Sequence, residues 1–304
     1  MQTTIERTHF MGWENCWRIT NGEIELIVTA DVGPRVIYFG SACGQNLFKT
    51  FEDQMGRSGE DCWMIRGGSR IWIGPEDRAV SYAPDNAPVE VEIRNDTLIA
   101  TAPEEESVRL QKQMIIRVSE NGKGVEIRHR VRNAGLMPTE FAVWVLTVMA
   151  PGGVAVTGFP PRGTHPEHLA PSNPLVMWPF TDLSDPRWRL LKKYLILRQD
   201  PQMIAPQKLG HFNPKTWGAY FLNGDLFIKW YTADPVRLYP DMGCSFEIFT
   251  NAEILELETM GPLCRVAPGG WIEHTEHWSL HRQVAPSVWT DDELDRVLLP
   301  LLEN

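Results

Sequence analysis

Two glutamates, Glu256 and Glu258, open a segment that reads ELETMGPLCRVAPGGWIEHTEHWSL over residues 256–280. The segment predicts two β-strands joined by a turn at 268–270. Side chains alternate between the faces of a strand, so the two glutamates share one face and Leu257 lies on the other. The leucine face requires a core, and the glutamates therefore face either water or a polar cleft. In a cleft, a carboxylate can act as a general base.

Two arginines, Arg66 and Arg70, flank a pair of glycines in the stretch RGGSRIWIG. Glycine lets the backbone approach a ligand closely, and the donor fork of arginine suits vicinal hydroxyls or a carboxylate. The alternative is a turn that carries two solvated arginines. The stretch is therefore a candidate substrate-binding segment.

The segment KLGH at 208–211 precedes a predicted strand at 217–222 and holds two candidates for a general acid. His211 is the first candidate and Lys208 the second, because both side chains carry a transferable proton. The alternative for His211 is a structural role. Asp241, which follows a proline, is a loop carboxylate that would bind ligand hydroxyls or cap a turn.

His165 and His168 form the sequence HPEH in a proline-rich region. This spacing would chelate a metal on a helix, but Pro166 disfavours a helix there. We expect no metal and no other cofactor, and a metal-dependent variant would depend on His165, His168 or His211.

Tryptophans lie close in sequence to these polar residues, among them Trp72 and Trp144. Indole rings stack on the apolar faces of ligands, so both residues are candidate ligand contacts. The alternative for each is the hydrophobic core, where tryptophan is usually buried.

Composition limits the partners and the location. The chain has 304 residues, a net charge of −10 and a pI near 5.3, which disfavours nucleic acid as a partner. Its five cysteines are odd in number, far apart and without CxxC spacing, as is typical of a reducing compartment. No apolar run approaches the ~20 residues of a membrane span, and no signal peptide is visible. We expect a soluble cytoplasmic protein with a small-molecule partner, and its oligomeric state stays open.

Strand patterns dominate the chain, and the middle region at 151–186 predicts long ordered loops. A helix is predicted only at the C-terminus, where Thr290 can cap it and apolar residues follow at helical spacing. Pro300 should break or kink this helix. Many short strands and few helices indicate a large antiparallel sandwich. The predicted strands are 23–30, 35–39, 89–94, 98–102, 108–118, 124–133, 140–149, 217–222, 226–231, 237–239, 244–250, 253–259 and 271–282.

The LET triplet at 257–259, the APGG turn at 267–270 and Trp278 together resemble the C-terminal part of aldose 1-epimerases, the galactose mutarotases. The stretches GGSRIWIGPED and YPDMGCSFEIFTNAEILELETMGPL resemble a bacterial branch of the galactose mutarotase-like superfamily. The resemblance implies one all-β domain over residues 1–304, a β-supersandwich of antiparallel sheets with one short C-terminal helix. It also implies carbohydrate binding in the cleft of a concave sheet, with Glu258 as the catalytic base and Arg70 as a substrate ligand.

The chain departs from that family at the catalytic acid. In mutarotases a histidine stands six residues after a proline, whereas here Pro138 is followed at that spacing by Trp144. The first hypothesis is a sugar epimerase in which His211 replaces the missing acid. The second is a non-catalytic carbohydrate-binding protein, in which Trp144 stacks on the sugar. The third is a glycoside hydrolase or lyase that uses Glu258 with a second carboxylate.

Overall fold

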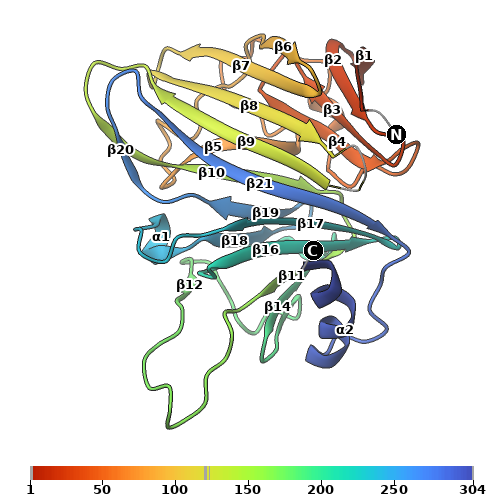
Figure 1. Cartoon of the computed structure of the whole chain (residues 1–304), viewed down its shortest axis with the longest axis vertical. Coiled ribbons are helices and arrows are strands. Elements are labelled where there is room, and N and C mark those ends of the chain that lie inside the picture. The colour runs from red at the N-terminus through yellow and green to blue at the C-terminus, as the bar shows by residue number, and fades with distance from the viewer. Residues whose placement is uncertain (1–2, 120–121, 123, 303–304) are drawn as a thin grey trace.

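The computed structural model describes residues 3–119, 122 and 124–302, and this part of the chain forms two large antiparallel β-sheets (Figure 1). From edge to edge, the eleven-stranded sheet consists of β1 (Thr4–Phe10), β2 (Trp13–Thr20), β3 (Ile24–Thr29), β4 (Arg35–Ser41), β5 (Gly68–Gly74), β10 (Thr139–Met149), β19 (Leu255–Met260), β18 (Phe246–Thr250), β15 (Gln207–His211) and β12 (Leu175–Met177), with β20 (Cys264–Val266) paired to β10. The ten-stranded sheet consists of β13 (Trp188–Leu190), β14 (Tyr194–Arg198), β11 (Val154–Gly158), β16 (Lys215–Leu222), β17 (Asp225–Thr232), β21 (Trp271–Arg282), β9 (Gly124–Asn133), β8 (Leu110–Val118), β7 (Thr97–Glu105) and β6 (Glu90–Arg94). The predicted all-β antiparallel fold is confirmed.

The main hydrophobic core lies between the two sheets, because alternate side chains of each strand point inward. Leu255 and Leu257 of β19 enter this core, as alternation predicts. In the same core Phe39, Phe227 and Trp278 pack edge to face, with ring centres 5.4–5.6 Å apart. Burial of each such aromatic side chain stabilises the fold by roughly 1.5–3 kcal/mol. We call the opposite face of the eleven-stranded sheet, turned away from the core, the site face.

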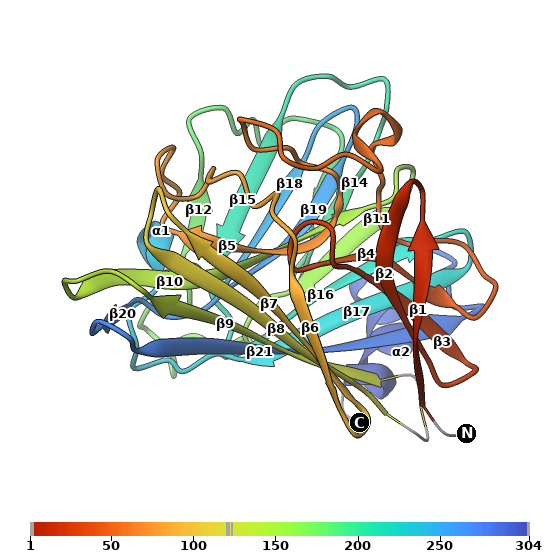
Figure 2. The same ribbon diagram turned by 90° about the horizontal axis from the view of Figure 1, so that it is seen from above.

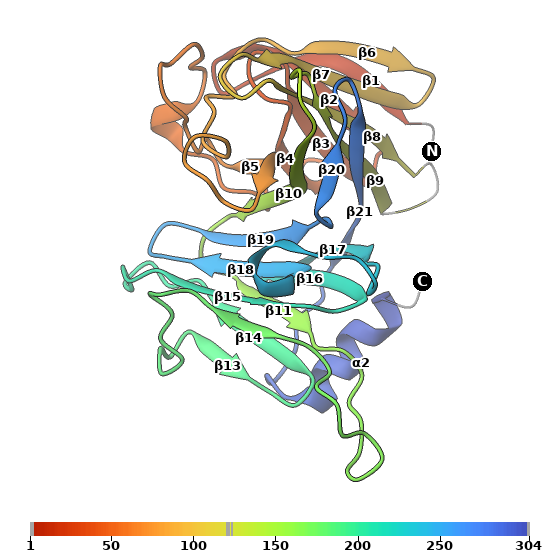
Figure 3. The same ribbon diagram turned by 90° about the vertical axis from the view of Figure 1, so that its left-hand side faces the viewer.

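Helix α2 (Asp291–Leu302) covers part of the outer face of the ten-stranded sheet (Figure 3). Leu294, Val297 and Leu298 are its buried residues, and Thr290 accepts a hydrogen bond from the backbone N–H of Glu293. The predicted capped helix is confirmed, and it continues two residues past Pro300. The other helical elements are a 3₁₀ turn, η1 (Glu52–Gln54), and a short turn, α1 (Pro240–Gly243). Within the described residues, no helix is long and apolar enough to cross a membrane.

The strands predicted between 89 and 133 form a meander of β6, β7, β8 and β9, whereas the strand predicted at 140–149 joins the other sheet as β10. The strands predicted at 217–222 and 226–231 form the hairpin of β16 and β17. The hairpin turns at Asn223 and Gly224, which both have positive φ. The strand predicted at 237–239 is wrong, because these residues form irregular backbone before α1. The loop predicted at 151–186 contains two short strands, β11 and β12. The sequence pattern also missed β1, β2, β5, β14 and β15, whose apolar positions lack a clear period of two or fall in short runs.

Candidate functional site

Backbone pairing places the predicted site residues in rows across the site face. Arg70 of β5 pairs with Leu146 of β10, which in turn pairs with Glu258 of β19, and Glu258 pairs with Glu247 of β18. Directly paired residues share a face and have adjacent side chains. Figure 2 shows β15, β18 and β19 side by side. The site face therefore gathers charged residues from strands far apart in the sequence.

Lys208 of β15 is the centre of this arrangement. Its Nζ lies 2.9 Å from Oε2 of Glu258, to which it donates a hydrogen bond, and 2.7 Å from Oε2 of Glu247. The ammonium group also lies over two indole rings, 4.8 Å from the centre of Trp144 and 4.7 Å from that of Trp178. Carboxylates and the electron-rich ring faces both stabilise a buried cation. We call Lys208, Glu247 and Glu258 the charged triad.

The charged triad is almost fully enclosed, and burial changes its titration. Burial raises the pKa of Glu258 to about 7, although Lys208 partly opposes this effect, and burial raises the pKa of Glu247 well above its ordinary value. Burial alone would lower the pKa of Lys208, but the two carboxylates raise it above its usual value. At neutral pH Lys208 is therefore charged and Glu258 is close to its midpoint. Oε1 of Glu258 has no hydrogen-bond partner among the described residues.

Arg70 and Glu256 form a second pair on the site face, with Nη2 of Arg70 3.2 Å from Oε1 of Glu256. Only 1% of Arg70 and 7% of Glu256 are exposed. The solvent-exposed alternative for these residues is therefore wrong, and it is also wrong for the fully buried Glu258 and Arg66. Arg66 lies in the loop before β5 and pairs with Glu60, so it is not in direct contact with the charged triad.

Aromatic rings lie between the charged triad and the pair of Arg70 and Glu256, and Trp72 and Trp144 among them are buried. Trp72 contacts Trp63, Tyr82 and Trp144 edge to face, with ring centres 4.8–5.4 Å apart. The Arg70 guanidinium lies over Trp63 and Trp72, 5.2 and 4.9 Å from the ring centres. The indole N–H groups of Trp63, Trp72 and Trp144 are buried and have no acceptor among the described residues. This aromatic wall can stack on a sugar ring and donate hydrogen bonds to it.

Two backbone features shape the lysine end of the site. Gly210 of β15 faces Glu247 across the strand pair, and a Cβ at this position would lie 2.5 Å from Sγ of Cys244 and 3.2 Å from the Trp178 ring. A glycine is therefore needed for Trp178 to approach Lys208. Asp241 lies half-buried in α1 with a left-handed φ of 51°, and its charge helps to raise the pKa of Glu247.

The histidines proposed from the sequence lie elsewhere. His211 points into the space between the sheets, on the opposite face of β15 from Lys208, and its Nε2 is 3.0 Å from Oγ1 of Thr157. The structure does not bring it together with Glu258. His165 and His168 lie in an exposed loop. Among the described residues, no three His, Cys, Asp or Glu side chains are placed to hold a metal.

Sequence reasoning missed Glu247 and Trp178. Strand alternation carried the signal for Glu247, because Phe246 and Ile248 fill the core and Glu247 must then face the same way as Glu258. Trp178 had no comparable signal, since it follows a three-residue strand in a long loop.

Sequence reasoning also missed a polar network inside the main core. Nζ of Lys229 lies 2.7 Å from Oε1 of Glu276, and His129 and Thr259 bond the same carboxylate. Lys229 also donates to the carbonyls of Val145 and Leu257, on the strands β10 and β19. The sequence signal for this network was a charged residue, Lys229 in β17 and Glu276 in β21, at a position whose side chain points into the core. The network lies on the core side of β10 and β19, and it stabilises these two strands, whose opposite faces carry the site.

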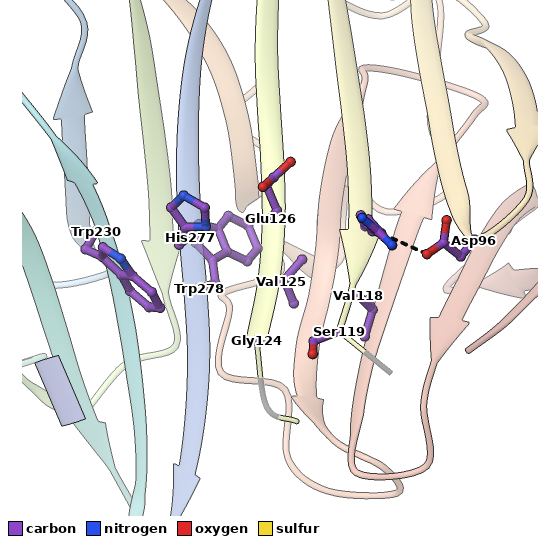
Figure 4. A pocket seen from close by; sticks show the side chains of 10 residues that line it. Asp96, Val118, Ser119, Gly124, Val125, Glu126, Trp230, His277 and Trp278 are labelled. Carbon is purple, nitrogen blue, oxygen red and sulfur yellow. Dashed lines mark hydrogen bonds and ion pairs between the residues drawn. The ribbon is translucent and has the colours of Figure 1, made fainter. Parts of the chain in front are cut away.

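A hollow of about 430 Å³ lies away from these residues, on the outer face of the ten-stranded sheet (Figure 4). Trp230 and His277 stack in its wall with ring centres 5.6 Å apart, and a second hollow of about 440 Å³ shares both residues. The two hollows therefore lie on the ten-stranded sheet, whereas the buried charged triad lies on the site face of the eleven-stranded sheet. We place the candidate site at the charged triad, because shifted pKa values and unfilled hydrogen-bonding capacity gather there.

Solved structures provide the comparison with known proteins. No protein-family model and no curated protein sequence matches the chain. A putative aldose 1-epimerase from Klebsiella pneumoniae has a TM-score of 0.61 at 11% identity, over 99% of this chain and 87% of that one. A galactose mutarotase-like protein from Lactobacillus casei has a TM-score of 0.58 at 10% identity, over 88% of this chain and 100% of that one. A galactose mutarotase related enzyme from Lactobacillus acidophilus has a TM-score of 0.54 at 11% identity, over 91% and 98%. The chain therefore has the all-β fold of galactose mutarotase-like and aldose 1-epimerase-like proteins.

Proposed function

We propose that this protein binds a sugar on the site face and exchanges the configuration at its anomeric carbon, as a sugar epimerase. Glu258 is the general base and Lys208 the proton donor. The contact of 2.9 Å between these two side chains carries the proposal, because it joins a base and an acid beside an aromatic wall. The fold shared with putative aldose 1-epimerases supports it.

The proposed reaction begins when Glu258 takes the proton of the anomeric hydroxyl. The bond between the anomeric carbon and the ring oxygen breaks, and its electron pair goes to the ring oxygen. Lys208 then transfers a proton to this oxygen, which as an alkoxide is more basic than an amine. Rotation of the open-chain aldehyde and the reverse transfers close the ring as the other anomer and restore both side chains.

The electrostatics of the charged triad suit these roles. A base with a pKa of about 7 is ionised in a large fraction of molecules at neutral pH and still takes up a proton readily. Glu247 is a second counter-charge for Lys208 and, when protonated, can return a proton to it. The ammonium group also stabilises the negative charge that develops on the ring oxygen.

The test is anomer exchange measured by NMR on a panel of free aldoses. We expect the wild type to accelerate exchange, with a rate that rises as the pH rises through about 7, where Glu258 ionises. Glu258→Gln should lower the rate by roughly 10²–10⁴-fold, the usual contribution of a general base. Glu253→Gln is the matched control, because it makes the same change at an exposed position just before β19. No acceleration of any sugar by the wild type would exclude the proposal.

A non-catalytic carbohydrate-binding protein is the second candidate. The aromatic wall and the complete pairing of Lys208 with two carboxylates favour it. In that case calorimetry should detect sugar binding that survives Glu258→Gln. Hydrolysis or a lyase reaction has less support, because Glu247 and Glu258 are directly paired on one sheet face and would lie on the same side of a sugar.

We also propose that the protein works in the cytoplasm. All five cysteines are free thiols, and Cys16 and Cys244 are buried. Free thiols persist in a reducing compartment, which supports this location.

A further inference from the structure

Unfilled hydrogen-bonding capacity is distributed unevenly along the site face. At the charged triad the unpartnered atoms are acceptors, Oε1 of Glu258 and Oε1 of Glu247. Around Arg70 they include many donors, namely Nε and Nη1 of Arg70 and the indole N–H groups of Trp63 and Trp72, while the indole N–H of Trp144 lies between the two ends. Buried polar groups in folded proteins nearly always have partners. A ligand that satisfies both groups of atoms must therefore donate hydrogen bonds at the charged triad and accept hydrogen bonds around Arg70.

Positive charge is in excess at the Arg70 end. Arg35 of β4 pairs directly with Arg70, and Arg66 adds a third buried guanidinium nearby. Among the described residues, the direct ion pairs of these arginines are those of Arg70 with Glu256 and of Arg66 with Glu60. Asp85, a further carboxylate near Arg35, is paired with Lys112. One guanidinium charge thus lacks a direct counter-ion.

The three guanidinium groups repel one another in a region of low dielectric constant. Arg35 donates to the backbone carbonyls of Ile65 and Gly67, while its Nε and Nη2 have no partner among the described residues. Burial and the charge of Arg70 lower the pKa of Arg35 to about 9. A buried cation cluster of this kind is strongly stabilised by an anion, and guanidinium groups suit carboxylates and phosphates.

We propose that the ligand of the site face is an anionic sugar, with a carboxylate or phosphate group bound at Arg70 and the anomeric hydroxyl at Glu258. This inference rests on the function proposed above and names its substrate class. Arg70 and Glu258 are two strands apart, which is about 10 Å between backbones. One sugar ring with an exocyclic anionic group can bridge a span of this size.

The experiment compares anomer exchange and calorimetric binding for glucose, galactose, glucuronate, galacturonate and glucose 6-phosphate. We expect the wild type to prefer an anionic sugar over its neutral parent by at least about tenfold in kcat/KM. A preference for the uronates identifies a carboxylate ligand, and a preference for the phosphate identifies a phosphorylated one. Equal use of neutral and anionic sugars would overturn the inference and leave the epimerase proposal standing.

Substitution of Arg70 tests where the anion binds. Arg70→Gln should lower kcat/KM for the anionic sugar by roughly 10–100-fold and change that of the neutral parent by much less. Arg94→Gln is the matched control, because Arg94 is exposed on the other sheet. If Arg70→Gln does not fold, competition by acetate or inorganic phosphate against the wild type replaces it, and the absence of competition by both would contradict the inference. Tight binding of an anionic sugar without exchange would support the inference and contradict the epimerase proposal.

Discussion

The charged triad places two carboxylates around one buried ammonium group. Removal of charges from water costs several kcal/mol per ion, so such a group persists only where its partners compensate for the cost. Lys208 has this compensation from Glu247, Glu258 and the rings of Trp144 and Trp178. Burial raises the pKa of Glu258 although a cation touches it, and the charge of Glu256 adds to this effect.

At the residue scale, the loss of Lys208 and the loss of Glu258 should have different effects on the stability of the fold. Lys208→Met leaves two buried carboxylates without a counter-ion and should lower the free energy of unfolding at pH 8 by about 3–5 kcal/mol. Because the folded-state pKa of Glu258 is raised, its stabilising contribution is lost as the pH rises through about 7. Glu258→Gln should therefore equal or exceed the wild type in stability at pH 8. Urea unfolding measures both, and a Lys208→Met variant as stable as the wild type would contradict the argument.

Strands position the charged triad, Arg70 and Glu256, and each strand does so through its pairing register. A shift of one residue in β18 would turn Glu247 into the core and Phe246 out of it. Lys229 stabilises the register from behind, since it bonds carbonyls of β10 and β19 at the level of Glu258. Gly210 of β15 leaves room for Trp178 to cover Lys208.

At the element scale, Gly210→Ala should disturb the charged triad without changing any charge. The new methyl group would meet Sγ of Cys244, the Trp178 ring and Cγ of Glu247. Such overpacking costs about 1–3 kcal/mol of stability, and we expect anomer exchange to slow because Glu247 and Trp178 must move. Gly124→Ala on β9 is the control, since among the described residues the nearest atoms to its new methyl group lie 3.9 Å away. Equal exchange rates in both variants would show that Trp178 does not need this space.

The two sheets share one main core, which collects side chains from strands along most of the chain. This supports the hypothesis of a single domain over residues 1–304. The same core holds three fully enclosed histidines. Burial lowers the pKa of His211 to about 4, that of His274 to about 3 and that of His129 below its ordinary value.

At the scale of the whole molecule, acid should destabilise the fold. The unfolded chain protonates these histidines near pH 6.5 and the folded chain does so at lower pH, so stability falls as the pH falls from about 6.5 toward 4. His211→Gln should reduce this slope by up to about 1.4 kcal/mol per pH unit. His9→Gln is the matched control, because it makes the same change at an exposed position on β1. Unfolding followed by tryptophan fluorescence and far-UV circular dichroism should give one common transition, and separate transitions would contradict the single-domain hypothesis.

The sequence predicted much of the fold and one half of the candidate site. Alternation in β19 separated Leu257 from Glu258, and the turn residues marked the β16–β17 hairpin. It did not predict that β19 and β21 belong to different sheets, because the turn between them shows only that the chain reverses. Nor did it identify Glu247, whose role depends on pairing with a neighbouring strand.

What the sequence determined by itself is local: the strand period, the turns, the helix cap and the face of β19 on which Glu256 and Glu258 lie. These features depend on neighbours a few residues apart. The tertiary structure decided that Lys208 rather than His211 meets Glu258, since both lie on β15 and only the packing of the two sheets defines which face is the core. It also decided that Glu256 and Arg70 are buried partners, 186 residues apart in the chain. Such pairs form because strand pairing brings distant segments to within hydrogen-bond reach, which no local pattern records.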